Sequence, residues 1–200
     1  MYAKLISANV LGIDGFLVEV EVDISNGLPA FDIVGLPDSS VREARERVRV
    51  ALKNCEANFP LQRITTNLAP ADIRKEGAVF DLAIAIGILG ASDQIPLSKT
   101  QGILFIGELA LDGSLRPLTG VLPMVMAAKD EGIEQVMLPV QNAEEGSLVD
   151  GIRVITIRSL SDAISYFRNE WTPQPIVRTN SYAPTFPLDF ADVQGQQHVK

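Results

Sequence analysis

The segment that most constrains the fold of this chain is Phe80–Leu89, which is apolar on nearly every face of a helix. A surface helix keeps one polar face, so this pattern predicts a helix that the rest of the protein covers on all sides. The segment is shorter than the ~18 apolar residues needed to cross a bilayer. The chain must therefore build a protein core around this helix, and a hydrophobic fraction of 46% supplies the side chains.

The segments around this helix predict both strands and helices. Residues 16–22 alternate apolar side chains with Glu19 and Glu21, which is the period of a half-buried strand. Ser40 and Glu43 have the spacing of a capping box and predict a helix start. The predicted strands are Ala3–Val10, 16–22, Ala30–Val34, Gln62–Asn67, Ile103–Leu109, Leu115–Leu118, Gln135–Leu138 and Arg153–Ile157. The other predicted helices are Phe80–Leu89, Val121–Glu131, Asn142–Leu148 and Leu160–Asn169.

The order of these elements predicts the fold class. Antiparallel strand pairs come first and a β-α-β alternation follows, so we expect the α+β class, with a mixed sheet and flanking helices in one domain, residues 1–169. Residues 170–188 are rich in proline and predict an extended linker. Residues 189–200 are expected to be the start of a further, truncated module.

Cysteine and histidine are too scarce for several kinds of site. With Cys55 as the single cysteine and His198 as the single histidine, an internal disulfide and a Cys/His zinc site are excluded, and no metal site is expected. A Ser-His-Asp triad would need His198, the third residue from the end, where a chain is usually least ordered. No convincing secretion signal or membrane span is visible, so we expect a cytoplasmic protein without a membrane partner.

Positive charge concentrates in residues 40–75, although the chain as a whole has a net charge of −8. The predicted helix at the start of this segment carries four cations away from its apolar stripe: Arg42, Arg45, Arg49 and Lys53. Guanidinium groups bind phosphate oxygens, so one interpretation of this helix is contact with DNA. The alternative is a solvated or inter-subunit face, because Glu43 and Glu46 are spaced to pair with Arg47 and Arg49.

A second candidate site is the turn Arg74–Gly77 together with Asp81 and Glu108. A lysine beside carboxylates at a helix start can bind an anion or activate a nucleophile, because the helix amides and dipole favour negative charge there. The alternative is structural, with Lys75 and Glu76 as solvated turn residues and Asp81 as a helix cap. The sequence has no glycine-rich phosphate loop, so nucleotide binding by these 200 residues is not expected.

Several motifs together carry a family resemblance. They are Gly35–Ser40, Arg45–Asn54, Asn67–Asp72, Lys75–Gly77, Phe80–Gly87 and Gly107–Gly113. In this order they resemble the N-terminal region of magnesium-chelatase-like AAA+ ATPases, the YifB/ComM family, over residues 1–169. The resemblance implies a fold similar to the proteolytic domain of Lon, which is also described as ribosomal-protein second-domain-like.

The resemblance also implies that the catalytic dyad of Lon is missing. Lon-type proteases carry Lys-Asp-Gly-Pro-Ser-Ala-Gly before the core helix, with the serine as nucleophile, and a lysine in a later Gly-Gly-Leu-Lys stretch as its base. Placing Lys75–Gly77 on the first motif puts Val79 at the serine position, and Leu122 falls at the lysine position. Neither side chain can attack or accept a proton, so we expect no catalytic residue in this fragment.

For a longer parent protein, the resemblance implies an ATP-driven, ring-forming motor, with DNA branch migration during natural transformation as the role associated with ComM proteins. Its implied cofactors are ATP and magnesium, while none is expected in this fragment. The implied partners are DNA and further copies of the chain in a hexameric ring. Gly195 and Gln196 match the family's segment near the adenine.

Two alternatives to a non-catalytic domain remain open from the sequence. One is a DNA-binding module that uses the basic residues 40–75. The other is an active peptidase with an unplaced pair, Ser92 or Ser114 as nucleophile and Lys99 or Lys75 as base.

Overall fold

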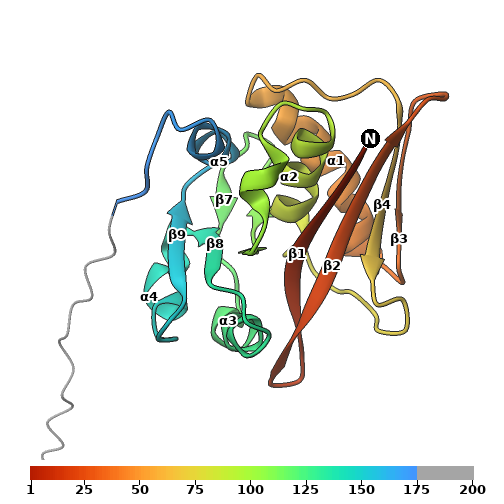
Figure 1. Ribbon diagram of the computed structural model, residues 1–200. Coiled ribbons are helices and arrows are strands. Elements are labelled where there is room, and N and C mark those ends of the chain that lie inside the picture. Colours follow the sequence, from red (N-terminus) through yellow and green to blue (C-terminus); the bar gives the residue numbers. More distant parts are fainter. Residues whose placement is uncertain (175–200) are drawn as a thin grey trace, which may run out of the picture.

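A computed structural model describes residues 1–174, which form an α+β fold around a mixed seven-stranded sheet with the order β3-β4-β2-β1-β5-β8-β9 (Figure 1). The strands are β1 (Tyr2–Leu11), β2 (Asp14–Ser25), β3 (Ala30–Val34), β4 (Arg63–Ala69), β5 (Ile103–Phe105), β6 (Glu108–Leu109), β7 (Leu115–Arg116), β8 (Gln135–Pro139) and β9 (Arg153–Ile157). The helices are α1 (Ser39–Asn54), α2 (Asp81–Ala91), α3 (Val121–Asp130), α4 (Ala143–Gly146) and α5 (Leu160–Phe167), with 3-10 turns η1 (Leu97–Thr100) and η2 (Val140–Asn142). The predicted class, a mixed sheet with flanking helices, is confirmed.

The predicted domain boundaries remain predictions. Most of the predicted linker, residues 170–188, and all of the predicted opening of a further module, residues 189–200, lie outside the described residues.

The first half of the sheet combines antiparallel and parallel pairs. β1 and β2 form a long antiparallel hairpin, and β2 also pairs antiparallel with β4. β3 pairs parallel with β4, so the connection between them must cross over, and α1 is that crossover. This topology leaves β3 at one edge of the sheet and places α1 beside it.

The second half of the sheet is parallel, as the predicted β-α-β alternation requires. β5 pairs with β1 and β8, and β8 pairs with β9. The single strand predicted for Ile103–Leu109 is wrong, because the chain leaves the sheet after β5 and forms the separate hairpin β6-β7. The chain turns away from the sheet at Gly107, whose amide donates to the carbonyl of Val79 and whose carbonyl accepts from the amide of Leu82 at the start of α2. The helix predicted for Asn142–Leu148 is shortened to α4, and Asn142 is the last residue of the preceding turn η2.

α2 forms the centre of the core, as its composition predicts. Every residue of α2 is buried, and the helix contacts β1, β2 and α1. Gly87 permits this close packing, because a Cβ atom there would lie 2.6 Å from Cγ2 of Val22 on β2. No helix within residues 1–174 combines the length and the apolar character that crossing a membrane requires.

α1 is amphipathic, and one prediction about its start is wrong. The N-cap is Asp38, whose carboxylate accepts from the amide of Val41 at 2.7 Å, and the predicted cap Ser40 lies inside the helix. The capping-box prediction is wrong because Asp38, an equally favourable capping residue, stands two positions before Ser40. The predicted pairs within the helix are confirmed: Arg47 lies 3.7 Å from Glu43, and Arg49 lies 3.8 Å from Glu46.

Candidate functional site

The resemblance assigns the nucleophile position to Val79, which has an apolar side chain and a hydrogen-bonded backbone. Val79 stands two residues before α2 and is buried in the hydrophobic core. Its carbonyl accepts the amide of Gly107 at 2.9 Å. The start of α2 is thereby attached to the segment that follows β5, and no hydroxyl is present at this point to react.

The position assigned to a general base is equally apolar. Leu122 is the second residue of α3, and its half-buried side chain packs against the core. Its amide donates to Oε1 of Glu145 at 2.9 Å, and Asn142 donates to the other oxygen of that carboxylate at 3.4 Å. Glu145 thus satisfies the amide of Leu122, which has no partner within the first turn of α3. The residue at this position therefore has a structural role, and it provides no amine.

Lys75 is buried, so the interpretation of this residue as a solvated turn side chain is wrong. Its ammonium group donates to the carbonyl of Pro70 and, at 2.7 Å, to the carbonyl of Ile73. Its backbone bonds to Leu36 and Asp38, which joins this turn to the segment before α1. Burial lowers the pKa of Lys75 from its ordinary value. Both named acceptors are backbone carbonyls, so the amine closes a turn instead of facing a reacting group.

Glu76 is exposed, as the structural interpretation expected, and its carboxylate lies 3.3 Å from Arg74. Glu108 is placed near α2 but pairs with Arg116 at 3.5 Å. The turn and Glu108 therefore do not converge on one anion site.

Asp81 pairs with α1 and does not cap α2, which corrects the second half of that interpretation. Its fully buried carboxylate accepts from Nε and from a terminal nitrogen of Arg47, at 2.7 and 3.0 Å, and from the amide of Leu109 at 3.2 Å. The same guanidinium also donates to the carbonyl of Ser40. Burial raises the pKa of Asp81 to about 6, and the bonds from Arg47 oppose this rise.

The hydroxyl and amine groups of the alternative peptidase pairs are all engaged elsewhere. Ser92 donates to the carbonyl of Ile88, one turn back in α2. Ser114 donates to the carboxylate of Asp112 in the β6-β7 turn. Lys99 donates to the carbonyl of Phe167 and to the side chain of Asn169. Among the described residues neither Ser92 nor Ser114 bonds to a lysine amine, and such a bond is the geometry that an activated nucleophile needs.

The four predicted cations of α1 are exposed and lie along one face, which we call the basic face: Arg42, Arg45, Arg49 and Lys53. Arg42 and Arg74 line a hollow beside Leu36–Ser39, at the N-terminal end of the helix. Arg49 and Lys53 line a larger pocket near its C-terminal end. The structure thus distributes the cations along the helix instead of gathering them at one point.

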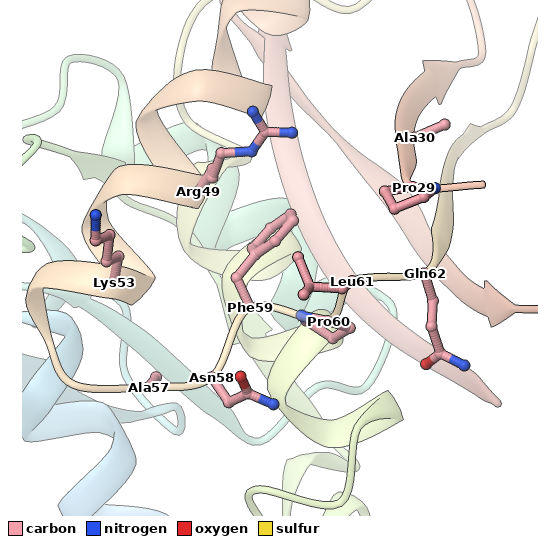
Figure 2. A pocket seen from close by; sticks show the side chains of 10 residues that line it. All are labelled: Pro29, Ala30, Arg49, Lys53, Ala57, Asn58, Phe59, Pro60, Leu61 and Gln62. Atoms are coloured by element: carbon pink, nitrogen blue, oxygen red, sulfur yellow. The ribbon is translucent and has the colours of Figure 1, made fainter. Parts of the chain in front are cut away.

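The larger pocket has a volume of about 560 Å³ and is mostly apolar (Figure 2). Its walls come from α1, from the start of β3 and from residues 57–62, which connect α1 to β4: Pro29, Ala30, Arg49, Lys53, Ala57, Asn58, Phe59, Pro60, Leu61 and Gln62. The Arg49 guanidinium lies 5.5 Å from the centre of the Phe59 ring, a cation–π contact. We call this the Phe59 pocket. No pattern in the sequence marks residues 57–61 as the wall of a pocket, because a connecting segment has no periodicity to interpret.

Cofactor sites find little support in the described residues. No group of three or more His, Cys, Asp or Glu side chains within residues 1–174 is placed to hold a metal ion. Gly195, Gln196 and His198 lie outside the described residues.

The mixed sheet, the buried α2 and the turn in front of it define a Lon-like domain, and comparison with known proteins agrees. Lon protease 2 of Bacillus subtilis is 26% identical over 167 residues, which cover 75% of this chain and 30% of that protein. Residues 20–142 match the family model described as subunit ChlI of Mg-chelatase.

More similar relatives place the chain within that family. It is 43% identical to the competence protein ComM of Haemophilus influenzae over 195 residues, 95% of this chain and 38% of the relative. It is 36% identical to the uncharacterized protein YifB of Escherichia coli over 190 residues, 95% of this chain and 37% of the relative. The chain belongs to the magnesium-chelatase-like family that includes ComM and YifB. It spans less than two fifths of the length of these relatives.

Proposed function

We propose that this chain is a non-catalytic Lon-like module of a larger magnesium-chelatase-like ATPase. The observation that carries the proposal is the pair of buried or half-buried apolar side chains, Val79 and Leu122, at the positions that the family resemblance assigns to the Lon nucleophile and its base. Nucleophilic catalysis requires both groups within hydrogen-bond reach of each other. The engagement of Lys75 with backbone carbonyls supports the same conclusion, because Lys75 is the buried lysine of the described residues and its amine is held by structural partners.

A serine-reactive fluorophosphonate tests this proposal on the purified chain, with intact-mass spectrometry as the readout. We expect no stoichiometric adduct, because Ser92 and Ser114 lack an amine partner. Ser92→Ala and Ser114→Ala serve as matched variants. An adduct that one of these substitutions abolishes, accompanied by cleavage of unfolded casein, would contradict the proposal and favour an active peptidase.

For the longer protein we propose an ATP-driven, ring-forming motor that remodels DNA in the cytoplasm, with ATP and magnesium as its cofactors. The proposal is supported by family membership and by the relative that is named a competence protein. A hexamer is the proposed assembly. In this arrangement the Lon-like module keeps its fold as an assembly or partner-binding part, while ATP hydrolysis occurs outside the described residues.

Branch migration by the full-length protein tests the motor proposal. A labelled three-strand DNA junction is incubated with the protein and magnesium, with ATP or with a non-hydrolysable analogue. We expect strand displacement only with ATP. ATP hydrolysis without strand displacement would contradict the DNA role, and a lack of hydrolysis would contradict the motor itself.

A further inference from the structure

β3 is an edge strand with one side of its backbone open. It pairs with β4 on one side and with no other strand within residues 1–174. An open edge presents unpaired N–H and C=O groups, which form a template for another strand. Natural edges are commonly protected by prolines, bulges or inward charges, but residues 30–34 contain only Asp32 as a charged side chain and no proline.

The basic face of α1 runs beside this open edge from one end to the other. β3 leads from the Phe59 pocket, which includes Ala30, to the hollow that includes Leu36. α1 then returns in the opposite direction, from Arg42 at that hollow to Lys53 at the Phe59 pocket. The open edge and the cations therefore border the same strip of surface, with a hollow at each end.

Three of the four cations on this strip have no carboxylate partner among the described residues. Among the described residues no carboxylate lies within 4.0 Å of Arg42, Arg45 or Lys53, and Arg49 reaches Glu46 only at 3.8 Å. Cations four residues apart on a helix repel one another, so keeping them on one face without anionic partners costs stability. An acidic partner along this strip would remove that repulsion.

We propose that β3 and the basic face of α1 form a docking site for an extended acidic peptide, which adds to the open edge of β3 as a further strand of the sheet. Strand addition satisfies the free backbone groups, and side chains at alternate positions supply the specificity. Alternate side chains of a strand are ~6.7 Å apart. Residues four apart on a helix rise by ~6 Å, so acidic side chains at every second position of the peptide match the spacing of Arg45, Arg49 and Lys53.

The same surface suits a peptide better than a nucleic acid. A phosphodiester backbone has no N–H groups to offer the edge of β3, and non-specific binding of single strands relies on aromatic rings that stack on bases. The Phe59 ring is half-buried, lies under the Arg49 guanidinium and contacts Phe31 at 5.9 Å between ring centres. It is therefore used in packing. The apolar walls of the Phe59 pocket, with Leu61 82% exposed at the rim, fit one apolar side chain of the peptide.

Fluorescence anisotropy with a labelled nonapeptide, (Glu-Val)4-Leu, tests the charge requirement. We expect saturable binding to the 200-residue chain that weakens about tenfold or more in Arg49→Glu/Lys53→Glu and, independently, in Arg42→Glu/Arg45→Glu. The matched control Lys129→Glu/Arg158→Glu changes two exposed cations that do not belong to the basic face, and it should leave peptide binding unchanged. Equal thermal unfolding of all variants shows that the basic-face substitutions did not unfold the protein.

N-methylated peptides test the strand addition. Successive N–H groups of a strand point to opposite edges, so methylating every Glu nitrogen blocks one edge of the peptide and methylating every Val nitrogen blocks the other. We expect one version to lose binding and the other to keep it. Equal behaviour of both versions, or no saturable binding of the unmodified peptide, would overturn the proposal. The proposal would also be overturned if the face bound a labelled oligothymidylate through Arg49 and Lys53 and did not bind the peptide. Self-association of the chain through this face would overturn it as well.

Discussion

Replacing Arg47 by methionine should destabilise the fold in a pH-dependent way, because it removes the charge that faces Asp81 inside the protein. The buried carboxylate accepts three hydrogen bonds, two of them from Arg47 at 2.7 and 3.0 Å and one from the amide of Leu109 at 3.2 Å. Methionine preserves most of the aliphatic packing and leaves the carboxylate with a single donor. Removing one partner of a buried pair costs about 3–5 kcal/mol, because the other charge stays buried and uncompensated.

The pH dependence follows from the pKa of Asp81. Burial raises this pKa to about 6, and Arg47 holds it below the value that burial alone would produce. Removing Arg47 raises it further, so the folded variant binds the proton more tightly than the folded wild type. At about pH 5 the carboxyl is largely neutral in both proteins, and the loss is that of ordinary hydrogen bonds, about 1–2 kcal/mol. At about pH 8 the wild-type pair is charged, and the loss should reach about 3 kcal/mol.

Urea-induced unfolding followed by circular dichroism measures both values as free energies of unfolding. Arg45→Met is the matched control, because Arg45 is exposed on the same helix and, among the described residues, its side chain bonds only to the carbonyl of Arg42. Its effect should stay within about 0.5 kcal/mol at either pH. Equal losses for the two variants, or a loss for Arg47→Met that does not grow with pH, would refute the reasoning that Asp81 depends on this guanidinium.

Three further predictions use the same unfolding assay. Lys75→Met should cost about 1–3 kcal/mol, since it leaves two backbone carbonyls without their donor, and a neutral result would contradict the buried position of the amine. Gly87→Ala should cost about 1–3 kcal/mol of unfolding free energy, because it forces a Cβ atom against Val22. At Gly77 a Cβ atom meets open space, so Gly77→Ala adds only the strain of the positive φ, about 1 kcal/mol. A larger loss for Gly77→Ala than for Gly87→Ala would contradict the packing of α2 on the sheet. The pKa of Asp81 is raised in the folded state, so its contribution to stability is full below its ordinary pKa of 3.8 and is lost as the pH rises through about 6. The difference in unfolding free energy between wild type and Asp81→Asn should therefore shift in favour of the variant as the pH rises over that range, and a shift in the opposite direction would contradict the raised pKa.

Local pattern was sufficient to predict the elements whose burial is set by their own composition. The apolar segment at residues 80–89 is buried on all sides, as its lack of a polar face requires. The alternation at residues 16–22 lies within β2, where Val18, Val20 and Val22 are fully buried. In these segments the side-chain period and the core agree, so the sequence alone determines which face is covered.

Pattern failed where partners come from distant segments. The position of Asp81 at a helix start favours a cap, but its partner Arg47 lies 34 residues away on α1. A charged residue in a turn, such as Lys75, is typical of a solvated side chain, but this turn folds against the segment before α1 and buries the amine. Both outcomes depend on how α1 packs against the rest of the chain, and a local window contains no information about that packing. The Phe59 pocket was missed for the same reason, because its walls come from three separate segments.

The most direct test of the non-catalytic proposal is the turnover of labelled casein by the full-length protein with ATP and magnesium, with Lon protease 2 of Bacillus subtilis assayed in parallel. Because Val79 and Leu122 are apolar at the positions that the resemblance assigns to the dyad, we predict no acid-soluble peptides above the level without enzyme. ATP-stimulated release of peptides that is lost in Ser92→Ala or Ser114→Ala would contradict the account.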